Sequence, residues 1–470
     1  MTRIRRLWNE SMSRRLIGWL AGAAFPAVKD AFFSSFLWAC WVWFDTNIRN
    51  SRIFQYIFDP TYLTNAWYAS AFYRQGTYGI RRLSFVTPRS SLRWNSLYIG
   101  LFLCAMLLVP NGLWSDIFLL SSFFLLAVFY FSHHASFRTG TVFALVNITL
   151  LLFWAALALA APYRAVQSLT YLLLGIDFFF LVSFSIRTKE DYIKIIRCIY
   201  VTLFALCCIG LIQQNVLHMT AHATFQDGVS FGEIIVLLFP FAFICPMTFD
   251  SAKRRIPYLA LLLMLTFTVV TATHSKAALI GFSAELLLLI LLIDWRYLPI
   301  LLFLGPAVTR TAVQNIAQMW DRSETYGNFF SNIFYAFRNF WNNGFGVSRS
   351  TFLDIYHSTA LDAQTGHALV QLPYLKISPF YFTFLIDIGT LILLGFLSYI
   401  LRLAHSALTS LFTAPKEYRI YFAAGFATLI GISVSSMMES TLFAPRTLLV
   451  YWGMLGLLRA ARIIRFGIIM

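Results

Sequence analysis

The sequence predicts an all-α polytopic membrane protein with about twelve transmembrane helices. Of its 470 residues, 59% are hydrophobic and only 12% are charged, and the mean hydropathy is +0.70. Apolar runs of roughly 18 to 22 residues recur along the chain, and each is about long enough to cross the hydrocarbon core of a bilayer as a helix. A soluble domain does not bury that much apolar surface, so a soluble fold is excluded.

Residues 1–95 form a basic, amphipathic and aromatic region ahead of the spans. They contain thirteen Lys or Arg residues among aromatic stretches such as FFSSFLWACWVWF. This combination is typical of helices that lie in the headgroup region of an anionic leaflet. We therefore expect a cytoplasmic, interfacial region that binds anionic lipids, with the alternative that one stretch is a short span. The first fifteen residues have no small-residue cleavage site, so no signal peptide is predicted.

Residues 96–470 are predicted to form the transmembrane domain. Its spans are expected near 96–110, 114–132, 141–161, 166–186, 192–212, 231–249, 256–274, 277–293, 297–312, 378–402, 418–437 and 445–464. A long loop, residues 313–377, separates the ninth span from the tenth. Long connections in compact proteins are usually functional, and we interpret this one as the lid and wall of an active site.

Basic residues sort the predicted loops into two sides. Loops on the same side as the N-terminus, together with residues 1–95, hold 28 of the 36 Lys and Arg residues. Because cytoplasmic loops carry the excess of basic residues, both termini are predicted to be cytoplasmic and the 313–377 loop external. This placement accounts for the net charge of +16 without a nucleic-acid partner.

Eight basic residues remain on the predicted outer side, against this rule. They are Arg164, Lys276, Arg310, Arg322, Arg338, Arg349, Lys376 and Arg446. Cations on that side are expected to meet a bound anion such as a phosphate or pyrophosphate. The alternative is that several of them pair with carboxylates such as Glu439, or reach lipid phosphates.

Motifs of soluble enzymes are absent from the sequence. It contains no Walker loop, dinucleotide fingerprint, His-Glu-x-x-His pair or nucleophile elbow, so ATP hydrolysis is not expected. The six cysteines lie in or beside apolar runs without the spacing of metal ligands, which is typical of small core residues.

Three other stretches share the predicted outer side of the membrane. They are TFQDGVSFGEIIVLLFP at 224–240, THSKAALIG at 273–281, and FWNNGFGVSRSTF at 340–352 followed by SPFYFTFLIDIGTLILLG at 378–395. In this order they resemble the O-antigen ligase and O-antigen polymerase superfamily of membrane glycosyltransferases. The first is similar to a short outer loop of that family, the second to its Thr-x-Ser-Arg-Gly segment, and the third to its Gly-x-Gly loop and following helix. The resemblance covers roughly residues 170–460.

The chain departs from the family pattern at three positions. Lys276 stands where the family usually has Arg. Ser378-Pro379 stands where the last helix often opens with His-Asn, and His367 lies eleven residues earlier. Tyr326 occupies a position where Arg is common, four residues from Arg322.

The resemblance implies a fold similar to the class C glycosyltransferases and transfer of a saccharide from a polyprenyl-pyrophosphate carrier to an acceptor sugar hydroxyl. The family needs no nucleotide sugar, metal or other cofactor for this reaction. Cations neutralise the departing pyrophosphate, and a base accepts the proton of the hydroxyl. The cations implied here are Lys276, Arg349 and Arg322, and the favoured base is His367.

Further residues complete the predicted site. Substrate binding is assigned to Asp227, Glu233, Arg338, Lys376, Glu439 and Arg446, of which the three carboxylates are also alternative bases. Three more carboxylates, Asp177, Glu285 and Asp387, fall inside predicted spans. An ionisable group is costly there and usually faces protein or a cavity.

Our first functional interpretation is a polymerase of lipid-linked polysaccharide repeat units in the bacterial cytoplasmic membrane, with a chain-length regulator as an additional partner. One alternative is a ligase or protein O-oligosaccharyltransferase that uses the same donor. Another is a lipid-linked sugar flippase or other transporter, which also suits twelve spans. Duplicated halves and paired broken helices, which are typical of many transporters, are not recognisable in the sequence.

Overall fold

The computed structural model describes residues 92–109, 188–249, 251–293, 390–438 and 445–466, with parts of 175–186 and a few isolated positions. The chain divides into two compact units, Met1–Ala69 and Ser70–Met470, and the helices described below all belong to the second. Predicted spans near 141–161 and 297–312 lie outside the described residues, as does the span near 114–132 except for Ser121. The total of twelve spans therefore stays a prediction.

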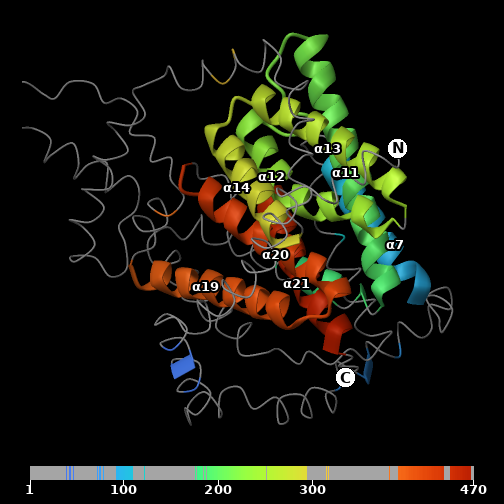
Figure 1. Cartoon of the computed structure of the whole chain (residues 1–470), viewed down its shortest axis with the longest axis vertical. Coiled ribbons are helices and arrows are strands. Elements are labelled where there is room, and N and C mark those ends of the chain that lie inside the picture. Colours follow the sequence, from blue (N-terminus) through green and yellow to red (C-terminus); the bar gives the residue numbers. More distant parts are fainter. Residues whose placement is uncertain are drawn as a thin grey trace, which may run out of the picture. The chain divides into compact units, whose positions relative to one another are not determined.

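The described part of the chain is helical and contains no strand. Its elements are α7 (Leu92–Leu108), α11 (Lys189–Asn215), α12 (Gly228–Ile244), η2 (Pro246–Thr248), α13 (Ala252–Ala272), α14 (Lys276–Ile293), α19 (Thr390–Thr413), α20 (Lys416–Ser435) and α21 (Pro445–Phe466) (Figure 1). This confirms the expectation of an all-α fold for these residues.

Six of the described segments are long and apolar enough to cross a membrane. They are Lys189–Asn215, Gly228–Thr248, Arg255–Ala272, Lys276–Ile293, Glu417–Ser435 and Arg446–Ile464. Each agrees closely with a span predicted from the sequence, because hydropathy and span length determine both. A shorter apolar helix, Ser96–Leu108, coincides with the first predicted span.

The predicted span 378–402 overlaps helix α19, but the placement of Arg402 in the following loop was wrong. Helix α19 continues to Thr413, so that only Ala414 and Pro415 connect it to α20. Arg402, which was expected in a loop, lies inside α19 and is 5% exposed. The helix continues because apolar residues keep helical spacing after the basic residue, and Ala407 and Leu411 are buried.

Helix α12 is the central helix of the described bundle. Every residue from Phe231 to Ile244 is buried, and the helix packs against α11, α14, α20 and α21 (Figure 1). A helix that is apolar on all sides is stable only when other helices surround it. The sequence of α12 therefore determines its central position.

Helix α11 is fixed at its N-terminus by side-chain hydrogen bonds. Thr188 caps the helix: its Oγ1 accepts from the backbone N–H of Asp191 at 3.2 Å and donates to Asp191 Oδ2 at 2.9 Å. Ser96 of α7 donates to the other carboxylate oxygen at 3.0 Å. The same carboxylate thus satisfies the cap of one helix and holds a second helix against it.

Two glycine contacts set the distances between helices. A Cβ on Gly281 of α14 would lie 3.0 Å from the carbonyl oxygen of Gly431 in α20, and a Cβ on Gly431 would collide with Glu285. At the start of α12, a Cβ on Gly228 would collide with the carbonyl oxygen of Thr273. The contact between Gly228 and Thr273 brings the N-termini of α12 and α14 together.

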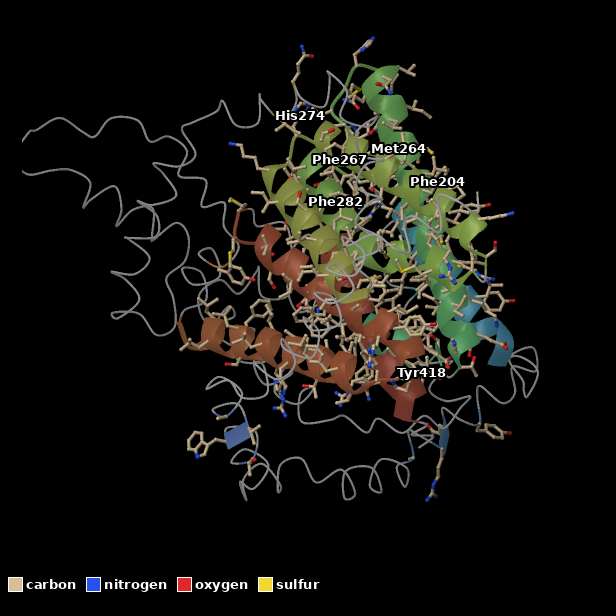
Figure 2. All side chains as sticks on the ribbon, viewed as in Figure 1. Phe204, Met264, Phe267, His274, Phe282 and Tyr418 are labelled. Carbon is tan, nitrogen blue, oxygen red and sulfur yellow. The ribbon has the colours of Figure 1, made fainter. Side chains whose placement is uncertain are left out.

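The two ends of the bundle are distinct. Figure 2 shows His274, which follows α13, at the opposite end of the bundle from Tyr418 in the first turn of α20. At the Tyr418 end, Lys189 forms an ion pair with Glu417 at 2.8 Å, and Arg462 donates to Ser406 at 2.8 Å. These basic residues were predicted to lie on the same side, and the structure brings them to the same end.

We expect Gly228→Ala to destabilise the protein by about 1 to 3 kcal/mol, because a methyl group there meets a backbone carbonyl that has no room to move. Thermal unfolding in detergent measures the effect. Gly425→Ala is the matched control, since its Cβ would meet the flexible end of Leu458 at 2.7 Å. An equal loss of Tm in both variants would contradict the proposed role of the Gly228 contact.

Candidate active site

The structure describes four of the ten residues predicted for the site. They are Lys276, Asp227, Glu233 and Arg446. The other six, His367, Arg349, Arg322, Arg338, Lys376 and Glu439, lie outside the described residues, and their assignments stay predictions.

Residues 216–227 form the loop between α11 and α12, and a glutamine side chain organises it. Gln213, in the last turn of α11, accepts from the backbone N–H of His222 at 3.0 Å and of Ala223 at 2.6 Å. Its amide donates back to the carbonyl of Ala223 at 2.9 Å. Three hydrogen bonds from one side chain hold this loop in a single conformation.

The loop is also bound to α7 and α13. Thr224 Oγ1 donates to the carbonyl of Leu107 at 2.6 Å, and the N–H of Ala221 donates to the carbonyl of Ala272 at 3.1 Å. His218 and Ala223 adopt positive φ values of 52° and 48°. Such values are costly for residues other than glycine, and they persist only where surrounding contacts enforce them.

Asp227 ends the loop and begins α12. Its Oδ1 accepts from the N–H of Ser230 at 2.7 Å, which is the hydrogen bond of an N-cap. Gly228 follows and lies against the carbonyl of Thr273. The sequence pattern Asp-Gly thus caps the helix and permits the close approach of the next segment.

The segment from Thr273 to Lys276 leads from α13 into α14. Ser275 Oγ accepts from the N–H of Ala278 at 3.1 Å, as an N-cap does, and Lys276 is the first residue of the helix. A Cβ on Gly232 of α12 would lie 2.5 Å from the Cβ of Ala278. Lys276 therefore stands at a helix N-terminus packed directly against the start of α12.

Arg446 brings a third helix N-terminus to the same loop. It is the second residue of α21 and is 5% exposed. Its Nη1 donates to the carbonyl of Thr224 at 3.4 Å, and its guanidinium lies over the ring of Phe225 at 5.7 Å. Phe225 stacks in turn on Phe231 of α12, with ring centroids 5.8 Å apart and planes 12° apart.

The electrostatic character of this end follows from these contacts. The N-termini of α12, α14 and α21 carry the positive ends of their helix dipoles, and Lys276 and Arg446 add two full charges in first turns. A cation at a helix N-terminus is unfavourable by roughly 0.3 to 1 kcal/mol, whereas an anion is favourable by a similar amount. The arrangement is therefore suited to bind an anionic group.

The carboxylates nearby have different environments. Asp227 is exposed and its side chain caps α12, whereas Glu233, further along the same helix, is 0% exposed. Asp177 and Glu285 are also buried, which confirms that these two face protein; Asp387 lies outside the described residues. Among the residues that the structure describes, Glu285 has no hydrogen-bond partner for either carboxylate oxygen.

Sequence reasoning missed three residues of this site. Gln213, His222 and Phe225 all contact the loop or belong to it, and none was assigned a role. Two histidines and two glutamines within ten residues of a predicted span end were a signal that could have found the loop. Nothing in their spacing, however, indicates which of them folds back onto the others.

The motif segments 224–240 and 273–281 are thus adjacent in space, and Arg446 joins them from α21. The third segment, residues 340–352, lies outside the described residues. No protein-family model matches this chain, and no curated protein sequence is significantly similar to it.

Proposed function

We propose that the protein polymerises lipid-linked polysaccharide repeat units, transferring a glycan from a polyprenyl-pyrophosphate carrier to an acceptor sugar hydroxyl at the outer face of the cytoplasmic membrane. The supporting observation is that one loop joins three helix N-termini, two of which carry Lys276 and Arg446 in their first turns. A pyrophosphate is the anionic leaving group that such an arrangement suits.

In this reaction the bond from the anomeric carbon to the pyrophosphate oxygen breaks, and its electron pair leaves with the pyrophosphate. The acceptor oxygen forms the new glycosidic bond, and its proton passes to a base. Lys276 and Arg446 stabilise the charge that develops on the pyrophosphate, with Arg349 and Arg322 as the cations proposed from the 313–377 loop. His367 is the base that the family resemblance proposes.

The length of the glycan in a deletion strain tests this function. Loss of long chains, with single repeat units still attached to their anchor, is the expected result for a polymerase. Loss of all attached glycan would assign a ligase or protein O-oligosaccharyltransferase instead. Failure of lipid-linked repeat units to reach the outer face, in a strain with an intact polymerase, would assign a flippase.

We expect the 216–227 loop to face the outside of the cell. Gln226→Cys, at an exposed position of this loop, should react with an impermeant thiol reagent on intact spheroplasts, as should Ser358→Cys in the 313–377 loop. Thr413→Cys, at an exposed position that precedes the start of α20 by three residues, should react only after permeabilisation. The reverse pattern would rule out an outer active site.

We expect Lys276→Ala to slow glycan transfer on the order of a hundredfold, while Lys276→Arg keeps most of the activity. The reason is that losing one charge-assisted contact to the leaving group costs about 2 to 4 kcal/mol in the transition state. In vitro transfer with purified lipid-linked repeat units measures the rate. Lys253→Ala, at an exposed position at the start of α13, is the control. A normal rate for Lys276→Ala at equal expression would exclude a phosphate contact.

A further inference from the structure

The imidazole of His222 has one nitrogen fixed by the loop itself. Its Nδ1 lies 3.1 Å from the backbone carbonyl oxygen of Phe225. A carbonyl oxygen only accepts hydrogen bonds, so Nδ1 must carry the hydrogen. In the neutral ring, Nε2 is then the nitrogen with the free lone pair, which is the tautomer that a general base needs.

The position of the ring is fixed as firmly as its tautomer. Gln213 accepts from the backbone N–H of His222 and of the next residue, Ala223. The side chain of His222 is half-buried, and within the described part of the chain its Nε2 has no hydrogen-bond partner. The ring thus presents an accepting nitrogen at a surface that solvent or a ligand reaches.

Phe225 connects this imidazole to the cationic end of the site. Its carbonyl accepts from His222, and its ring lies beneath the guanidinium of Arg446. The carbonyl of the preceding residue, Thr224, accepts from the same guanidinium. An imidazole and a cation are therefore held by two consecutive residues of one loop, as an acceptor hydroxyl next to a pyrophosphate requires.

We propose that His222 Nε2 is the proton acceptor of the transfer reaction, an inference that rests on the proposed function. The acceptor hydroxyl donates its hydrogen to Nε2 as its oxygen bonds to the anomeric carbon. The bond between that carbon and the pyrophosphate breaks, and the electron pair leaves with the pyrophosphate beside Arg446. Deprotonation of the resulting imidazolium by water restores His222 for the next transfer.

The carboxylates at this end are less suited to the same step. Asp227 uses its Oδ1 to cap α12, and Glu233 is fully buried within the bundle. His222 combines partial exposure with a fixed tautomer. The assignment therefore places the base in the 216–227 loop and not at His367.

His222→Asn is the decisive variant. The amide nitrogen of Asn occupies nearly the place of Nδ1, so it keeps the hydrogen bond to the Phe225 carbonyl but provides no base. We expect the single-turnover transfer rate to fall on the order of a hundredfold or more in both His222→Asn and His222→Ala. Donor binding should be unchanged, since the proton is transferred only in the transition state.

His218→Asn is the matched control, because His218 is exposed on the same loop and its φ of 52° suits asparagine. His367→Asn is measured in parallel. Each rate is divided by the amount of protein that binds the lipid-linked donor, so that misfolded protein does not count as inactive enzyme.

A fall in rate in both His222 variants, with His218→Asn near wild type, supports the assignment. Near-normal turnover of His222→Asn overturns it: if His222→Ala is slow, the residue only holds the loop, and if His367→Asn is slow, the base lies in the 313–377 loop. Failure of the wild-type protein to extend the purified repeat unit would overturn the proposed function together with this inference.

Discussion

The close contact between Gly228 and the carbonyl of Thr273 is the constraint on which this end of the protein depends. It leaves no space for a side chain between the start of α12 and the turn that opens α14. Helix α12 is also the buried centre of the bundle. The contact therefore fixes the position of Lys276, the first residue of α14, relative to that central helix. The loop that ends at Asp227 must then lie over the same turn, which the hydrogen bond from Ala221 to Ala272 shows.

Arg446 is a buried cation at the N-terminus of α21. Removing a guanidinium from water costs several kcal/mol, and the N-terminus of α21 adds an unfavourable dipole. The cation–π interaction with the ring of Phe225 stabilises the guanidinium by about 0.5 to 2 kcal/mol. The 3.4 Å hydrogen bond to the carbonyl of Thr224 adds little more stabilisation. These contacts hold the guanidinium against residues 224 and 225 of the loop, so the cation and the loop keep a fixed relation to each other.

Hydropathy and length were sufficient to predict the described spans, because both are local properties of the chain. They failed at α19, where Arg402 ended the apolar window although the helix continued with its apolar face on α20. Lys276 was identified through the family resemblance of its segment, and Asp227 was assigned to substrate binding, whereas the structure shows that its carboxylate caps α12. The hydrogen bonds of Gln213 and the contacts of Phe225 join residues through the tertiary fold, and one sequence gives no signal of which partners meet.

The 216–227 loop owes its rigidity to four different helices. Gln213 of α11, Leu107 of α7, the last residue of α13, and Arg446 of α21 each contact it through a hydrogen bond. Dipoles held in place before the substrate arrives cost no reorganisation when charge develops in the transition state, and for that reason they stabilise it more than water does. Hydrogen bonds to four helices restrict the conformational freedom of this loop. Two of its residues have positive φ values, which lowers the stability of the folded protein. That loss is understandable if the loop must present an imidazole and a buried cation to a substrate in a constant geometry.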